Sequence, residues 1–457
     1  MAQLHPFEDT IVALATPQGV SAIAVIRLSG PEAIAITQKL FTGKDLRTVP
    51  THTAHFGALT GGGTTLDEVL VTVFRAPRSF TREDCVEIGC HGSPLIIKSI
   101  IRELLANGAR LAKAGEFTQR AFLHGRFDLA QAEAVADLIH AETDNARQAA
   151  LNQMRGGFSS EIKALRAELI HFASLVELEL DFGEEDVEFA RRDDLRALID
   201  RLQQHLTPLI ESFDQGNVIK NGIPTVIAGK PNAGKSTLLN VLLNEERAIV
   251  SDIPGTTRDV IEDEIILGGL AFRFMDTAGL RETTDAIESI GVQRTREQMS
   301  RASLILYIFD LATTDPAEIT KQEAEIEQTG KTVLKVGNKT DCAPPALLRE
   351  LQNRGFVLIS AARREGIEEL KARILEALHV DRVKPGDVLV TNLRHYENLR
   401  QTQAALQRVA DGLDHRVTGD FLAMDIRQAL HFLGEITGEI TTEDLLTNIF
   451  SKFCIGK

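Results

Sequence analysis

Residues 223–243 read IPTVIAGKPNAGKSTLLNVLL, and this stretch decides the fold of the middle of the chain. An apolar run predicts a buried strand, the glycine-rich loop Gly229-x4-Gly234-Lys235-Ser236 follows, and an amphipathic pattern then predicts a helix. Backbone N–H groups of such a loop converge on phosphate at the positive end of the helix. We therefore predict a phosphate-binding loop, in which Lys235 bridges β- and γ-phosphates and Ser236 offers its hydroxyl to Mg²⁺.

Two further segments continue the same site. FRFMDTAG, residues 272–279, places Asp276 at the end of an apolar strand, where it would hold Mg²⁺ directly or through water. The backbone N–H of Gly279 would contact the γ-phosphate. PGTTRD lies between this segment and the phosphate loop, and its Thr257 is predicted to complete the magnesium shell.

The base is predicted from TVLKVGNKTD, which ends a strand at Asn338, Lys339 and Asp341. A carboxylate here can accept two hydrogen bonds from guanine N1–H and the exocyclic amine, and adenine offers no such pair. FVLISAA then places Ser360 and Ala361 at the next strand end, where a backbone N–H would meet the guanine oxygen. Four motifs in this order predict a Ras-like α/β domain that binds and hydrolyses GTP.

The residue after DTAG departs from Ras-type switches, in which a glutamine orients the attacking water. Here that residue is Leu280, which can neither donate nor accept a hydrogen bond. Hydrolysis must use another acidic or amide side chain, a partner's arginine or a metal ion. Glu288 and Arg281 in the segment LRETTDAIESIG are candidates.

The sequence on either side of this domain has a different character. Short β-like runs and two helix-like stretches over about the first 120 residues predict an α+β domain. Helical spacing begins near Asp128 and resumes after VKPGD, so we predict one helical bundle with the nucleotide domain inserted into it. The residues predicted to face the core of its first helices are Leu129, Ala132, Ala136 and Ile139, followed by Ile162, Leu165, Leu169, Phe172 and Val176. The predicted segments are 1–124 for the N-terminal domain, 125–215 for the first helical part, 216–382 for the inserted domain and 383–457 for the second helical part.

Composition limits the partners and the compartment. A net charge of −15 argues against broad, non-specific nucleic-acid binding over the whole surface. Four cysteines fit a reducing compartment. The absence of an eighteen-residue apolar run and of a basic leader predicts a cytoplasmic protein that crosses no membrane.

The flanking blocks carry a family resemblance over essentially the whole chain. DTIVALATPQG, IAVIRLSG, FTREDCVEIGCHGSP, GEFTQRAFLHGRFDLAQAEAVADLI and the terminal FCIGK together resemble the MnmE (TrmE) family of tRNA-modification GTPases. The resemblance implies homodimers that associate through an N-terminal tetrahydrofolate-binding domain. It also implies a helical domain and an inserted G domain with a mixed, mostly parallel six-stranded sheet. The main rival, a ribosome-assembly GTPase of the Era or Der type, would carry a KH-type or second G domain, and neither is visible in the sequence.

The resemblance also implies chemistry. Family members act with the FAD-dependent partner MnmG (GidA), in a heterotetramer, on the wobble uridine of certain tRNAs. They add an aminomethyl or carboxymethylaminomethyl group at C5, with a carbon from 5-formyl- or methylene-tetrahydrofolate. A potassium ion takes the place of an arginine finger, and the partner is expected to supply much of the tRNA-binding surface.

Carried over by residue, the resemblance gives Asn232, Ser251, Ile253 and Thr256 as potassium ligands and Glu288 as the catalytic glutamate, beside Lys235. It gives Arg27, Glu87, Arg126 and Lys457 as folate contacts. Cys454 is either a participant in one-carbon transfer or a passive recognition element. The predicted GTP-binding set is Asn232, Ala233, Gly234, Lys235, Ser236, Thr237, Ser251, Asp252, Ile253, Pro254, Gly255, Thr256, Thr257, Asp276, Thr277, Ala278, Gly279, Asn338, Lys339, Asp341, Ser360 and Ala361.

Overall fold

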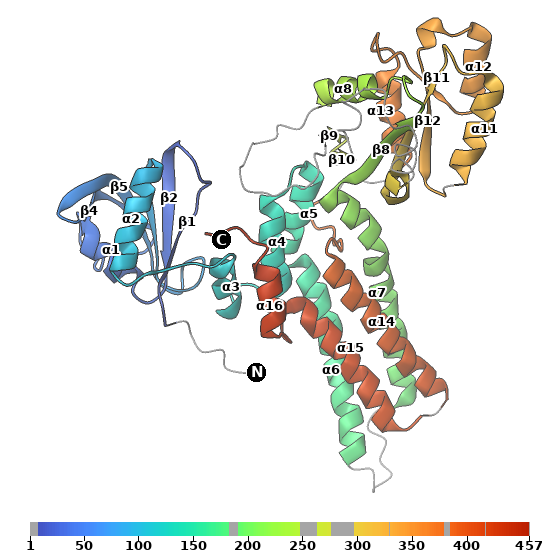
Figure 1. The fold of residues 1–457 in the computed structure, drawn as a ribbon. Coiled ribbons are helices and arrows are strands. Elements are labelled where there is room, and N and C mark those ends of the chain that lie inside the picture. Colours follow the sequence, from blue (N-terminus) through green and yellow to red (C-terminus); the bar gives the residue numbers. More distant parts are fainter. Residues whose placement is uncertain are drawn as a thin grey trace. The chain divides into compact units, whose positions relative to one another are not determined.

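A computed structural model describes residues 8–181, 191–246, 263–275, 297–328, 330–378, 384–415 and 417–456 (Figure 1). The chain divides into two compact units, and each is described by itself. The first unit consists of Met1–Ile139, Gln153–Leu206 and Glu397–Lys457, and the second of His140–Asn152 and Thr207–Tyr396. The segment limits expected from the sequence stay a prediction.

The second unit is built on a six-stranded sheet in the order β13-β12-β11-β8-β10-β9. All neighbouring strands are parallel except that the edge strand β9 is antiparallel to β10. The predicted mixed, mostly parallel sheet is therefore confirmed. The strands are β8 (Ile223–Gly229), β9 (Asp263–Leu267), β10 (Leu270–Phe274), β11 (Leu304–Asp310), β12 (Thr332–Asn338) and β13 (Val357–Leu358).

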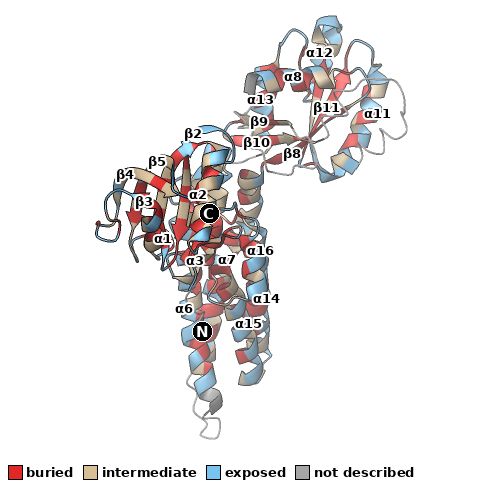
Figure 2. Cartoon of the chain, turned by 60° about the vertical axis from the view of Figure 1, so that its left-hand side comes forward, coloured by how far each residue is buried: buried red, intermediate tan, exposed pale blue. Residues whose placement is uncertain are grey.

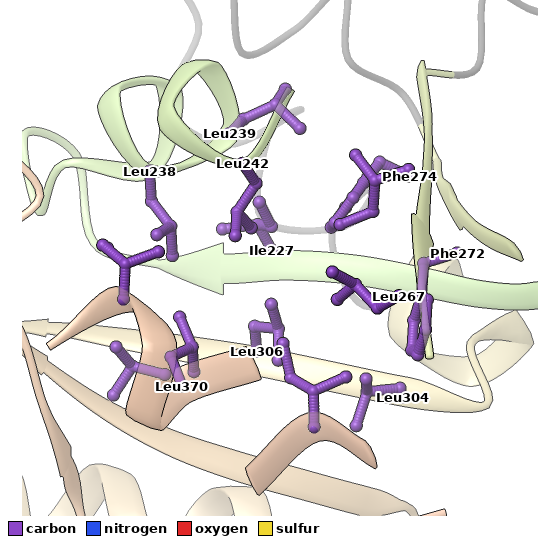
Figure 3. Close-up of a cluster of buried hydrophobic side chains, with 14 of the residues drawn as sticks. Ile227, Leu238, Leu239, Leu242, Leu267, Phe272, Phe274, Leu304, Leu306 and Leu370 are labelled. Atoms are coloured by element: carbon purple, nitrogen blue, oxygen red, sulfur yellow. The ribbon is translucent and has the colours of Figure 1, made fainter. Parts of the chain in front are cut away.

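Alternating side chains of the central strand β11 build the core on both faces of this sheet. Leu304, Leu306 and Ile308 face α8 (Lys235–Glu246) and α13 (Ile367–Glu376) in the cluster of Figure 3. Phe309 belongs to a second cluster with residues of α11 (Pro316–Glu327) and α12 (Pro345–Asn353). Helices on both faces leave the carboxyl ends of the parallel strands for a ligand, as in other open α/β sheets.

The first unit contains a seven-stranded sheet in the order β3-β4-β5-β6-β2-β1-β7. Helices α1 and α2 contribute to the core on this sheet. The elements are β1 (Ile11–Leu14), β2 (Ser21–Ser29), α1 (Ala33–Leu40), β3 (Phe41–Thr42), β4 (Thr53–Gly61), β5 (Thr64–Phe74), β6 (Cys85–Gly92), α2 (Pro94–Ala106) and β7 (Arg110–Leu111). The mixture of strands and helices confirms the predicted α+β domain.

Helices with buried stripes make up the rest of the first unit (Figure 2). The predicted stripe of Ile162, Leu165, Leu169, Phe172 and Val176 is buried along α6. The helices that lie wholly in this unit are α3 (Glu116–Leu123), α4 (Leu129–Ile139), α6 (Gly157–Asp181), α15 (Gly419–Thr437) and α16 (Glu443–Phe450). Three helices have residues in both units: α5 (Asp144–Met154), α7 (Arg192–Asn221) and α14 (Leu393–Asp414).

One residue of the predicted stripes differs. Ile139 was expected in the core with Leu129 and Ala132, but 43% of it is exposed. It is the last residue of α4, so no further turn of that helix follows it. No helix in the described part of the chain combines the length and apolarity that a bilayer crossing requires.

Candidate functional site

The phosphate loop joins β8 to α8 and depends on two glycines. Gly229 and Gly234 have φ angles of 144° and 96°, which side-chain-bearing residues rarely adopt. A Cβ on Gly229 would lie 2.3 Å from the Ile308 carbonyl oxygen, and one on Gly234 would lie 2.2 Å from Nδ2 of Asn338. The loop therefore has this path only with glycine at both positions.

Lys235 is the first residue of α8, and its side chain folds back over the loop. Its Nζ donates hydrogen bonds to the carbonyl oxygens of Gly229 (2.9 Å) and Lys230 (2.8 Å). Burial lowers the pKa of this ammonium below its ordinary value. Because an ammonium has three donors, these two bonds hold it in position and still allow it to bind a phosphate.

Asn338 connects the phosphate loop to the strand ends that carry the base motifs. It is 3% exposed, its Nδ2 donates to the Ala233 carbonyl (2.8 Å), and its Oδ1 accepts from the Ala361 N–H (3.0 Å). This amide thus joins three loops that are more than twenty residues apart in sequence. Its role is to fix the distance between the phosphate loop and the predicted base pocket.

Asp341 is held by a neighbour from the next strand end. Its Oδ1 accepts a hydrogen bond from Ser360 Oγ at 2.8 Å, and its Oδ2 lies 3.4 Å from Nε of Arg363. The Ser360 hydrogen bond is the main reason why the pKa of Asp341 lies below its ordinary value. The carboxylate is therefore ionised and an acceptor at neutral pH, as recognition of guanine requires.

The sequence predictions missed Asp310, which ends β11. Its Oδ2 lies 2.6 Å from Nζ of Lys339, so it belongs to the same constellation. The one signal for it was an aspartate closing the apolar run LILYIFD, which resembles the end of the strand before Asp276.

Replacing Ser360 with alanine is expected to move the acid limit of nucleotide binding to higher pH. A lowered pKa means that the charged Asp341 is present at neutral pH and is lost as the pH falls through that pKa. Without the Ser360 donor the pKa rises, so binding fails at a higher pH. Titrating nucleotide affinity from pH 7 to pH 3, a range that extends below the ordinary aspartate pKa of about 3.9, measures the limit. A Ser303→Ala variant, changed elsewhere in the same unit, should keep the wild-type curve, and an unshifted Ser360→Ala curve would contradict the assignment.

A second cluster lies in the first unit, where three of the four predicted folate contacts are described. Nε of Arg27 donates to Glu87 Oε1 (2.9 Å) from the paired strands β2 and β6. The guanidinium carbons of Arg27 and Arg126 lie 5.6 and 5.5 Å from the ring centroid of Phe80, and Arg126 also donates to the Ser79 carbonyl. Two cations and a carboxylate thus gather around Phe80, an aromatic ring that the sequence predictions missed.

The C-terminal tail reaches this cluster. Ile455 pairs with Ala114, the Cys454 carbonyl accepts from the Gly115 N–H (3.4 Å), and the Gly456 carbonyl accepts from Arg27 (3.4 Å). Gly456 has a φ of 94°, and a Cβ there would lie 2.3 Å from the Leu14 carbonyl oxygen. The tail is therefore seated closely against the strand β1, and the Cys454 side chain is exposed.

Several predicted residues lie outside the described residues, so the structure does not place them. They are Ser251, Asp252, Ile253, Pro254, Gly255, Thr256, Thr257, Asp276, Thr277, Ala278, Gly279, Glu288 and Lys457. Of the described ones, Asn232 has a φ of 61° in the phosphate loop, and Ser236 and Thr237 lie in the first turn of α8. Within the described ranges, no three His, Cys, Asp or Glu residues group as a metal site.

A phosphate loop at the carboxyl end of a parallel strand, with the base motifs at the neighbouring strand ends, defines the class of P-loop GTPases. Two family models together match nearly the whole chain. "GTP-binding protein TrmE N-terminus" matches residues 10–126, and "MnmE helical domain" matches residues 129–454.

Relatives identify the family. A protein of Cytophaga hutchinsonii named tRNA modification GTPase MnmE is 60% identical to this chain, and the alignment covers 98% of each protein. A protein of the same name from Christiangramia forsetii is 52% identical, and the alignment covers 98% of this chain and 99% of the relative. The chain therefore belongs to the MnmE family of tRNA modification GTPases, and it is a GTP-hydrolysing enzyme. Among solved structures, the G domain of the T. maritima FeoB iron transporter aligns over 34% of this chain and 98% of its own, at 26% identity and a TM-score of 0.27.

Proposed function

We propose that this protein is the GTP-hydrolysing component of a system that modifies the wobble uridine of tRNA at C5. It adds an aminomethyl or carboxymethylaminomethyl group with a one-carbon unit from a folate. The observation that carries this proposal is the near full-length similarity to proteins named for tRNA modification. Two features of the structure support it: the cluster around Arg27 and the nucleotide-binding loops. GTP hydrolysis and one-carbon transfer need separate sites, and the chain has a candidate for each.

The nucleotide site fits GTP with magnesium and potassium. Lys235 binds the β- and γ-phosphates, and Asn338 and Asp341 hold the guanine. Ser236 and Thr257 would hold Mg²⁺, near Asp276, and Asn232, Ser251, Ile253 and Thr256 would hold K⁺. Bound cations would neutralise charge that develops on the phosphates. Glu288 would orient the attacking water, a role that Leu280 cannot fill because it neither donates nor accepts a hydrogen bond.

The cluster in the first unit fits a tetrahydrofolate derivative, either 5-formyl- or methylene-tetrahydrofolate. Arg126 and Lys457 suit the glutamate carboxylates of a folate, because guanidinium binds carboxylate bidentately. Glu87 can accept from N–H donors of the pterin ring, and the ring of Phe80 offers a stacking surface. Cys454 either takes part in one-carbon transfer or only closes the site.

The assembly we propose is a homodimer that joins the FAD-dependent MnmG in a cytoplasmic heterotetramer and acts on tRNA. The exposed cross-strand pair Phe56 and Leu70 supports an interface on the N-terminal sheet, since 69% and 49% of these side chains are exposed. Large apolar side chains that lie together on an exposed face can mark an interaction surface. The net charge of −15 fits a division in which MnmG supplies much of the tRNA-binding surface.

The test is mass spectrometry of wobble nucleosides in tRNA from cells that lack this gene. We expect the C5-substituted uridines to vanish on deletion and to return with the wild-type gene, but not with Lys235→Ala or Arg27→Ala. Arg102→Ala, which removes an exposed arginine of α2, should restore them. Persistence of the modified uridines in the deletion strain, with no second copy of the gene, would refute the function; restoration by Arg27→Ala would refute the folate site alone.

A further inference from the structure

Asp310 stands at the end of β11, directly opposite Asn338 at the end of the parallel strand β12. The Oδ1 atom of Asp310 accepts a hydrogen bond from the Ala312 N–H (3.0 Å), and its Oδ2 lies 2.6 Å from Nζ of Lys339. Only 8% of the Asp310 side chain is exposed, and each of its two carboxylate oxygens has one of these contacts, so the carboxylate is held in position. A fixed anion at this strand end determines where the lysine ammonium can lie.

Lys339 is a residue that needs such a partner. Its φ is 65°, a left-handed conformation that is unfavourable for a residue with a side chain. It follows Asn338 and precedes Asp341 by two residues, so its backbone sets the direction of both base-binding side chains. The lysine side chain is 35% exposed, and its apolar stem can cover a flat ring while its ammonium stays paired.

We propose that Asp310 is a positioning residue for guanine nucleotides: it holds Lys339 in the conformation in which the lysine stem covers the base and the Asn338–Asp341 turn keeps its shape. Asp310 itself touches no nucleotide. The proposal rests on the assignment of Asn338, Lys339 and Asp341 to the guanine.

The same strand provides a matched control. Lys335 of β12 lies 2.6 Å from Glu323 of α11, and its side chain is 22% exposed against 12% for the glutamate. This ion pair has the same distance and similar burial, but it lies beside α11 rather than at the strand end. Glu323 also contacts Arg354, so Glu323→Gln removes at least as much ion pairing as Asp310→Asn. If an ion pair on β12 acted only by stabilising the fold, loss of either pair would have the same consequence.

The experiment measures the affinity for a fluorescent N-methylanthraniloyl GDP with the full-length protein. We expect Asp310→Asn to weaken binding about tenfold, as loss of one charge-assisted hydrogen bond implies. Glu323→Gln should weaken it less than twofold. In a Lys339→Ala background, Asp310→Asn should have almost no further effect, because the residue through which it acts is gone. The kcat at saturating GTP should change little in Asp310→Asn.

Three outcomes would overturn the proposal in distinguishable ways. If Lys339→Ala weakens binding but Asp310→Asn does not, Asp310 has no positioning role and the guanine site stands. If Asp310→Asn weakens binding equally with and without Lys339, it does not act through the lysine. If neither variant changes the affinity, the guanine assignment itself fails, and this inference fails with it.

Discussion

Asp341→Asn is expected to weaken GTP binding by roughly 10²–10⁴-fold and to create an enzyme that accepts xanthosine triphosphate. Each of two hydrogen bonds between the carboxylate and the guanine N–H groups contributes about 1.5–3 kcal/mol. The carboxamide has only one acceptor oxygen, and its NH₂ group points a donor at the guanine amine. Xanthine has a carbonyl oxygen where guanine has that amine, so the same NH₂ group becomes a matching donor.

The measurement compares kcat/KM for GTP and xanthosine triphosphate in the wild type and in Asp341→Asn. Asp315→Asn is the control, because Asp315 caps α11 through the Ala317 N–H and lies in the same unit. It should leave the nucleotide preference unchanged. A variant at 341 that keeps its preference for GTP would show that this carboxylate does not contact the base.

The sequence was sufficient for the fold of the nucleotide domain because its signals are local. The glycines at 229 and 234 are needed for backbone reasons that lie within a strand–loop–helix unit. The alternation along LILYIFD places Leu306 and Phe309 on opposite faces of one strand, and both are buried. Local pattern therefore predicted the α/β class and the strand–loop–helix unit of the phosphate loop, whereas the six-stranded mixed sheet was expected from the family resemblance.

The residues that the sequence did not reveal act over long separations. Asp310 pairs with Lys339 across 29 positions, and this pairing depends on the register of β11 with β12. Phe80 contacts Arg27 and Arg126 across long separations in sequence, and only the folded domain brings the three together. No hydrophobic periodicity in the sequence indicates such contacts, because each depends on one side chain rather than on a repeated pattern.

Arg120→Met is expected to destabilise the N-terminal domain by about 3–5 kcal/mol, since it removes one member of a buried ion network. The Arg120 side chain is 0% exposed and lies 2.6 Å from Asp9, 3.1 Å from Glu83 and 3.0 Å from Glu116. Methionine fills much of the volume but leaves these carboxylates without that cation. Arg110 also contacts Asp9 and Glu116, but it does not reach Glu83 in any described ion pair.

The destabilisation should depend on pH, and the direction follows from Glu116. Burial raises its pKa, but hydrogen bonds from Arg110, the Lys113 N–H and Arg120 outweigh burial, so its pKa in the folded protein lies below the ordinary value. This network therefore stabilises the wild type above the ordinary glutamate pKa of about 4.3 and loses that contribution as the pH falls below it. The difference between wild type and Arg120→Met should be large at pH 7 and smaller near pH 4.

Hydrogen exchange at pH 7 measures the effect within the domain that carries the network. Amides of β1 and β6 should lose protection by roughly 10²–10⁴-fold in Arg120→Met, whereas those of β8 and β11 in the second unit should exchange as in the wild type. Arg102→Met is the control, because that side chain is 72% exposed and its nearest recorded carboxylate lies 3.6 Å away. Calorimetry at pH 7 and pH 4 then tests the pH dependence. If Arg120→Met were as stable as Arg102→Met at pH 7, then Arg110 and the surrounding hydrogen bonds would be sufficient for the three carboxylates, and the buried arginine would not be needed for stability.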